Sequence, residues 1–108
     1  MLLDDPHNPL TIEIRQEMAE AYFGACRKML ASLNALKAFD RAALSTPKNV
    51  EQITRRSELL DDAAERVHYV LIQREAMRLR YSAEFLEDCE VPAEVKARMG
   101  RRTTQSNS

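Results

Sequence analysis

Residues 44–49, with the sequence LSTPKN, decide the fold because they interrupt two long stretches of helical pattern. Thr46 is suited to cap a helix that has Pro47 in its first position, where the missing N–H costs nothing. Asn49 offers a second start, since Gln52 stands three residues later in capping-box spacing. Two helices joined by so short a connection lie side by side and antiparallel. The stretch therefore predicts a helical hairpin.

Apolar residues recur at steps of three and four on both sides of this connection, the spacing of one face of an α-helix. We expect a first helix over about residues 10–43 and a second over about residues 48–88. In the first helix the apolar positions are Ile14, Met18, Tyr22, Ala25, Met29, Leu33, Leu36 and Phe39. In the second helix they are Val50, Ile53, Leu60, Ala64, Val67, Leu71, Met77, Tyr81 and Phe85.

A short third helix is expected over about residues 92–99. Pro92 suits a first helical position, and Gly100 is placed to end the helix. Residues 1–9 are polar and contain two prolines, so we expect an N-terminal arm there. The ending RRTTQSNS, residues 101–108, has the composition of a disordered tail.

The composition restricts the class of protein. The 108 residues suffice for one domain, which we place at residues 10–100. Two glycines and an aromatic content of 6% are typical of an all-α chain rather than a loop-rich β protein. The formal net charge of -1 gives the whole chain no attraction to nucleic acid or anionic lipid. The sequence has neither a secretion signal nor an apolar run of ~18 residues, so we expect no membrane contact and a cytoplasmic location.

The apolar stripes are wider than one partner helix can cover. Around Val70-Leu71-Ile72 the second helix is apolar on more than one side, which requires more than one neighbour. We expect a homodimer in which two hairpins form a four-helix bundle, and a monomer with the third helix over the end of the hairpin is the alternative. The expected interface residues are Tyr22, Cys26, Met29, Val67, Val70, Leu71 and Met77.

Arg74 falls in the apolar seam of the second helix. Residues equally far from the connection share a height in a hairpin, which places Glu20 level with Arg74 and Glu17 within one turn. We expect Arg74 to form a partly buried ion pair with one of them that fixes the register of the helices. The alternative is that its stem lies on the core while its guanidinium reaches water.

The two cysteines are expected to be reduced thiols, because Cys26 and Cys89 form neither a CxxC pair nor a disulfide framework. The hairpin would separate them by about 30 Å at ~1.5 Å per residue, whereas a disulfide needs Cα atoms within roughly 7 Å. This geometry excludes an intrachain disulfide. Cys26 shares a height with His68, but a small buried thiol beside an imidazole is favoured over a zinc or catalytic pair.

Glu65 and His68 form a Glu-x-x-His sequence on the second helix, the spacing of ligands in di-iron carboxylate bundles. Encapsulated ferritins resemble this arrangement in outline. The first-helix residue level with Glu65 is Met29, which cannot replace an oxygen ligand, and Glu20 is ~13 Å away along the axis. A metal-binding bundle with Glu65 and His68 at the dimer interface stays an alternative, and we expect no cofactor.

Arginines in the second helix and the tail suggest a second alternative, a nucleic-acid accessory protein. Acidic residues are interleaved with them and no aromatic platform accompanies them, which favours an ordinary solvated surface. The sequence contains no phosphate loop, dinucleotide fingerprint or serine-nucleophile elbow, so we expect no enzymatic activity. The basic residues in question are Arg66, Arg74, Arg78 and Arg80, followed by Lys96, Arg98, Arg101 and Arg102.

Three stretches resemble a family of short alphaproteobacterial helical proteins with no assigned function. They are Asp62-Ala63-Ala64-Glu65-Arg66-Val67, Gln73-Arg74-Glu75-Ala76, and Val91-Pro92-Ala93-Glu94-Val95 through Met99-Gly100. The resemblance covers about residues 10–100 and implies a helical fold and a bacterial source, without a substrate or an active site. The sequence as a whole predicts a non-enzymatic interaction or scaffold protein that acts through homodimerisation and contacts with an unknown protein partner.

Overall fold

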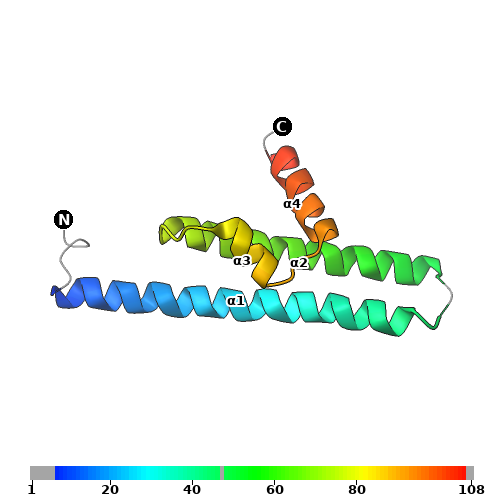
Figure 1. The fold of residues 1–108 in the computed structure, drawn as a ribbon, viewed down its shortest axis with the longest axis horizontal. Helices are drawn as coiled ribbons and strands as arrows, with labels where there is room; N and C mark the ends of the chain where they lie inside the picture. The colour runs from blue at the N-terminus through cyan, green and yellow to red at the C-terminus, as the bar shows by residue number, and fades with distance from the viewer. Residues whose placement is uncertain (1–6, 47, 107–108) are drawn as a thin grey trace.

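The computed structural model describes residues 7–46 and 48–106, with side chains described as far as residue 100. Within these residues the chain forms helices and no strands, which confirms the all-α prediction. The helices are α1 (Pro9–Ala43), α2 (Val50–Ala76), α3 (Ser82–Asp88) and α4 (Ala93–Ser106) (Figure 1). None of the described helices has the length and apolar character needed to cross a membrane.

The two long helices start at asparagine caps. The Asn8 side chain accepts a hydrogen bond from the Leu10 backbone N–H at 2.9 Å, with Pro9 in the first position. Asn49 accepts from the backbone N–H of Gln52 at 2.8 Å. The second helix therefore begins at residue 50 rather than 48, because its cap is Asn49 and not Thr46.

The helices α1 and α2 lie side by side, with the connection between them at one end of both (Figure 1). Asp40 and Arg56, near the connection, are in contact across a sequence separation of 16 residues. Tyr22 and Arg74, at the opposite end, are in contact across a separation of 52 residues. The core lies between these helices and under α3 and α4. It consists of Tyr22, Ala25, Met29, Leu33, Leu36, Leu60, Ala63, Ala64, Val67, Val70, Val91 and Val95.

The prediction of one helix over residues 48–88 is wrong, because α2 ends at Ala76. Arg78 adopts a left-handed backbone with φ of 59°. Its N–H donates to the Glu75 carbonyl at 3.0 Å, and the N–H of Leu79 donates to the Arg74 carbonyl at 2.9 Å. This pair of hydrogen bonds is a Schellman motif, which normally has glycine at the left-handed position. The sequence has arginine there, so the end of the helix had no local signal.

After this turn α3 folds back, and Figure 1 shows it in front of α2 and running toward α1. It ends in a second Schellman motif, in which Glu90 has φ of 57° and the Val91 N–H donates to the Leu86 carbonyl at 3.0 Å. Phe85, Leu86 and Cys89 pack, partly buried, against the core. Folding back therefore covers apolar surface that a straight helix would leave without a neighbour.

The last helix, α4, starts at Ala93 and continues through Gly100 to Ser106. The predicted helix 92–99 followed by a disordered tail is wrong over this range, because glycine weakens a helix by about 1 kcal/mol without ending it. Residues 107–108 of the predicted tail and residues 1–6 of the predicted arm lie outside the described residues. Val95 and Met99 pack α4 against the core, and the C-terminal part of α4 projects away from the body (Figure 1).

Candidate functional site

Arg74 is the most buried charged side chain described, with 8% of its surface exposed. Its Nη1 donates to the Tyr22 hydroxyl at 2.8 Å and its Nη2 donates to the Arg80 carbonyl at 2.7 Å. Its Nε reaches the Ser82 hydroxyl at 3.4 Å, and the guanidinium stacks over the Phe85 ring at 4.1 Å. Arg74 therefore ties together α1, the turn after α2, and α3.

The predicted ion pair of Arg74 with Glu20 or Glu17 is wrong. Both glutamates are exposed, and within residues 7–46 and 48–100 no ion pair joins either of them to Arg74. The fold-back of the chain after Ala76 brings neutral acceptors and an aromatic ring within reach of the guanidinium instead. Burial raises the pKa of Tyr22, so its hydroxyl stays neutral and accepts the arginine N–H. The arrangement is a structural clamp built around a buried cation.

The predicted interface residues are turned inward within a single copy. Met29, Val67 and Val70 are fully buried, because α3 and α4 cover the apolar stripe that the sequence left without a neighbour. Cys26, Leu71 and Met77 are partly buried against the same core, and the seventh residue, Tyr22, is buried. Tyr22, Met29, Val67 and Val70 cannot pair two copies unless the protomer opens, so the prediction is wrong for these four, while Cys26, Leu71 and Met77 keep part of their surface exposed.

Glu65 and His68 are both exposed on α2. They line an open groove of about 660 Å³ together with small residues of α1 such as Ala21 and Gly24. Within the described part of the chain no group of three or more His, Cys, Asp or Glu side chains is placed to hold a metal ion. Met29, the residue level with Glu65, is buried in the core. The structure thus supplies no further ligand to the predicted pair.

A second open groove, of about 840 Å³, lies between α1, α2 and α4 near the connection. Its polar wall is Arg56, whose Nε donates to Asp40 at 2.7 Å and whose Nη1 donates to Glu94 at 2.7 Å. The hydrogen bond from Arg56 lowers the pKa of both carboxyl groups. Phe39 and Ile53 supply apolar lining. Sequence reasoning missed this cluster, although the height comparison within the hairpin puts Asp40 close to Arg56.

The arginines considered for nucleic acid do not form one basic face. Arg66 lies 3.7 Å from Asp62. Another basic side chain of this region, Arg98, donates to Asp61 at 2.9 Å. Both are therefore paired with carboxylates of α2. Arg74 is buried, Arg78 and Arg80 are exposed in the turn after α2, and the side chains of Arg101 and Arg102 lie outside the described ones.

Cys26 and His68 do not form a pair, since His68 is exposed whereas Cys26 packs against the core. Cys89 also packs against that core. The predicted 30 Å separation of the two cysteines assumed one straight second helix, and α3 folds back instead. The geometric exclusion of an intrachain disulfide is therefore wrong in its premise, although both thiols are free in this structure.

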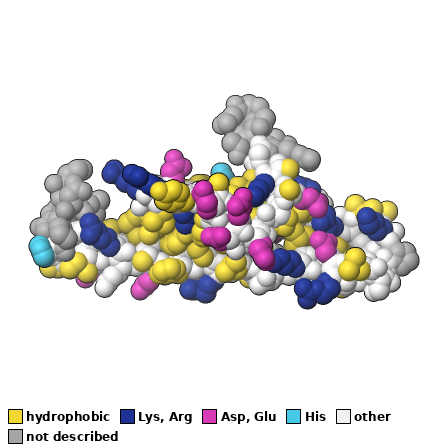
Figure 2. Space-filling view, in the orientation of Figure 1, with side chains coloured by type: hydrophobic (Ala, Val, Ile, Leu, Met, Phe, Trp, Pro, Cys, Tyr) yellow, Lys and Arg dark blue, Asp and Glu magenta, His cyan; other side chains and the backbone are white. Residues whose placement is uncertain are grey.

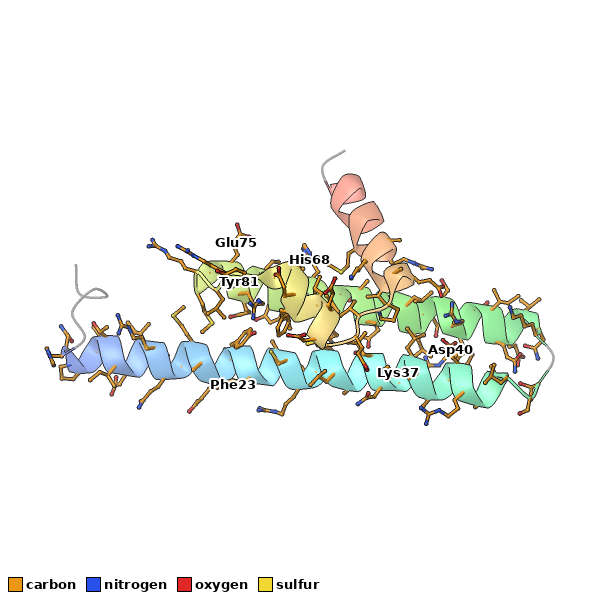
Figure 3. All side chains as sticks on the ribbon, viewed as in Figure 1. Phe23, Lys37, Asp40, His68, Glu75 and Tyr81 are labelled. Carbon is orange, nitrogen blue, oxygen red and sulfur yellow. The ribbon has the colours of Figure 1, made fainter. Side chains whose placement is uncertain are left out.

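The exposed side of α1 carries a second apolar stripe, which the periodicity of the sequence did not distinguish from the buried one. It consists of Ile12, Ala19, Phe23 and Leu30, which follow one another at steps of seven, four and seven residues. We call it the outer stripe. Ile12, Phe23 and Leu30 are 44%, 59% and 42% exposed. Phe23 lies on the side of α1 turned away from α2 (Figure 3), and Figure 2 shows hydrophobic side chains gathered over the N-terminal half of α1.

The exposed charges of α1 are separated by sign along its length. The half before Gly24 carries three glutamates and one arginine. The half after Gly24 carries four basic residues and one aspartate, of which Asp40 is engaged by Arg56 and Lys37 by Glu90. One surface of the molecule therefore combines an apolar stripe with an acidic and a basic end.

No family model, curated protein or solved structure matches this chain. The resemblance to short alphaproteobacterial proteins stays a prediction.

Proposed function

We propose that this chain is a non-enzymatic helical interaction protein whose working unit is a homodimer. In this dimer α1 of one copy pairs with α1 of the other in the antiparallel sense along the outer stripe. Each copy contributes its own hairpin of α1 and α2, so the assembly aligns four long helices with the two α1 helices at its centre. The site that was predicted for this contact is buried, and the outer stripe takes its place.

The separation of charge along α1 is the observation that carries the proposal. When two copies of α1 run in opposite directions about a centre near Phe23 and Gly24, the acidic half of each faces the basic half of the other. Glu20 of one copy then lies level with Arg27 of the second copy. A parallel pair would put like charges together, which is unfavourable at helix contacts.

The spacing of the outer stripe independently favours a second helix packed along α1. Steps of seven and four residues are those of the a and d positions at a coiled-coil seam. Phe23, at the centre of the stripe, exposes 59% of its surface in the single copy. Large aromatic side chains at the centre of an interface commonly contribute most of the binding energy.

The shape of the single copy also favours a partner. Its radius of gyration is 17.4 Å, and its principal extents are 60 × 32 × 22 Å. A compact domain of this size has a radius of gyration of about 13 Å. The elongated copy therefore exposes more surface than its length requires, including the outer stripe.

Charge reversal tests the proposal directly. Glu20→Arg and Arg27→Glu should each weaken the dimer, because each places like charges opposite one another in both symmetric contacts. The double variant Glu20→Arg with Arg27→Glu should recover most of the affinity. Sedimentation equilibrium over a range of concentrations measures all four dissociation constants, and Glu75→Arg, a charge change on the side of α2 away from α1 (Figure 3), serves as the matched control.

Two results would end the proposal. One is a native chain that stays monomeric at every concentration reached in the centrifuge. The other is a dimer whose affinity falls with each single reversal and falls further in the double variant, because opposite charges would then not face each other.

A further inference from the structure

We propose that Cys26 and Cys89 are a redox-sensitive thiol pair, which a peroxide oxidises to a reversible disulfide that fastens the end of α3 to α1.

The Arg74 clamp brings α1, which contains Cys26, close to α3, which Cys89 follows. Arg74 contacts Tyr22 of α1 at 2.8 Å and the Phe85 ring of α3 at 4.1 Å. Cys26 follows Tyr22 by one helical turn. Cys89 follows Phe85 by one turn, and its N–H donates to the Phe85 carbonyl at 3.0 Å. Both cysteines are thus one turn away from the same clamp.

A second contact fixes the direction in which the segments run. Lys37 of α1 and Glu90, the residue after Cys89, form an ion pair at 2.8 Å. Along α1 the order is Tyr22, Cys26, Lys37, and along the returning segment it is Phe85, Cys89, Glu90. The two cysteines therefore lie between the same two cross-links, on segments that follow one another in the same direction.

The surroundings of the thiols agree with this placement. Both side chains are partly buried against one hydrophobic cluster, and both thiols are free. Burial raises the pKa of Cys89, and the charge on Cys26 raises it further. Cys89 is thereby held as a thiol, so we assign the first attack to Cys26.

The chemistry consumes one peroxide for two thiols. The Cys26 thiolate attacks one peroxide oxygen, the O–O bond breaks, and the products are a Cys26 sulfenic acid and, after proton uptake, water. Cys89 then gives up its proton, and its thiolate attacks the Cys26 sulfur. The S–S bond forms as the S–O bond breaks, and the hydroxyl leaves as a second water. The charge of Arg74 favours the Cys89 thiolate that this step needs.

The bond would act on the joint between α2 and α3. In this joint Arg78 and Tyr81 have φ of 59° and 61°, a left-handed backbone that side chains other than glycine adopt with difficulty. The reduced protein holds α3 in place through noncovalent contacts alone. The oxidised protein would keep α3 folded back on α1.

The test treats the full-length reduced protein with an equimolar amount of hydrogen peroxide. Three readouts are taken: intact mass, peptide mapping without reductant, and thermal unfolding before and after dithiothreitol. We expect the mass to fall by two hydrogen atoms, a joined peptide to contain Cys26 and Cys89, and the melting temperature to rise by about 10 °C or more, because the bond closes a long loop. Dithiothreitol should reverse all three.

Cys26→Ser and Cys89→Ser are the matched variants. Each should keep the melting temperature of the reduced native protein within a few degrees and lose the increase on oxidation. The proposal is overturned if both native thiols oxidise without a joined peptide. It is equally overturned if the only disulfide joins two copies, or if the joined protein melts at the same temperature as the reduced one.

Discussion

Replacing Arg74 with methionine should destabilise the protein by about 3–5 kcal/mol. The variant keeps most of the stem but removes the guanidinium of a residue that is only 8% exposed. Two short hydrogen bonds are lost, to the Tyr22 hydroxyl at 2.8 Å and to the Arg80 carbonyl at 2.7 Å. Hydrogen bonds to charged groups contribute about 1.5–3 kcal/mol each, and the stacking on Phe85 adds about 0.5–2 kcal/mol. The desolvation of an arginine without a carboxylate partner offsets part of this sum.

A double-mutant cycle separates the clamp from a general loss of packing. Urea unfolding followed by far-ultraviolet circular dichroism, at one fixed protein concentration, gives the free energy of unfolding for each variant. Arg74→Met and Tyr22→Phe should show a coupling energy of about 1–2 kcal/mol, because their side chains share a buried hydrogen bond. Glu20→Ala is the control, and its effect should add to that of Arg74→Met within about 0.5 kcal/mol.

Two outcomes would refute the reasoning about Arg74. A coupling to Tyr22 indistinguishable from zero would mean that the hydrogen bond contributes nothing beyond packing. A coupling to Glu20 of about 1 kcal/mol or more would mean that the guanidinium meets the carboxylate that the sequence suggested, and that the clamp has the wrong partner.

Three further predictions concern the dimer, the helix ends and acid stability. Phe23→Ala should weaken the dimer about 100-fold or more in sedimentation equilibrium, since 59% of this ring is available for burial, while thermal unfolding of the monomer at low concentration should hardly change. Arg78→Gly should raise the free energy of unfolding by about 0.5–1 kcal/mol because glycine adopts φ of 59° without strain, whereas Arg78→Ala should not stabilise; loss of stability with glycine would contradict this. Arg56 lowers the pKa of Asp40 in the folded protein. The stability that this pair contributes is therefore fully present above the pKa that the carboxyl group has in the unfolded chain, and it is lost as the pH falls through the lower pKa of the folded state. Urea titrations across the acid range should therefore show a steeper loss for the native protein than for Arg56→Met.

Much of the fold follows from local patterns in the sequence. A spacing of three and four residues marks the buried faces of α1 and α2, and Met29 and Val67, taken from that pattern, are fully buried. Asn49 is a cap because a short side-chain acceptor can reach the free N–H groups of a first turn. Such signals act between residues at most four positions apart, so they can be recognised in a single sequence.

The sequence by itself thus determined that the chain is helical, where α1 begins, two possible starts for α2, and which faces of these helices are apolar. Only the tertiary structure decided that the second helix stops at Ala76, that Arg74 meets Tyr22 rather than Glu20, and that Cys89 returns to α1. The turn at Arg78 carries no glycine, and its left-handed backbone is locally unfavourable. This unfavourable backbone energy is offset by the burial of apolar surface on α3 against residues some fifty positions away in the sequence. No local pattern in the sequence reveals that stabilisation.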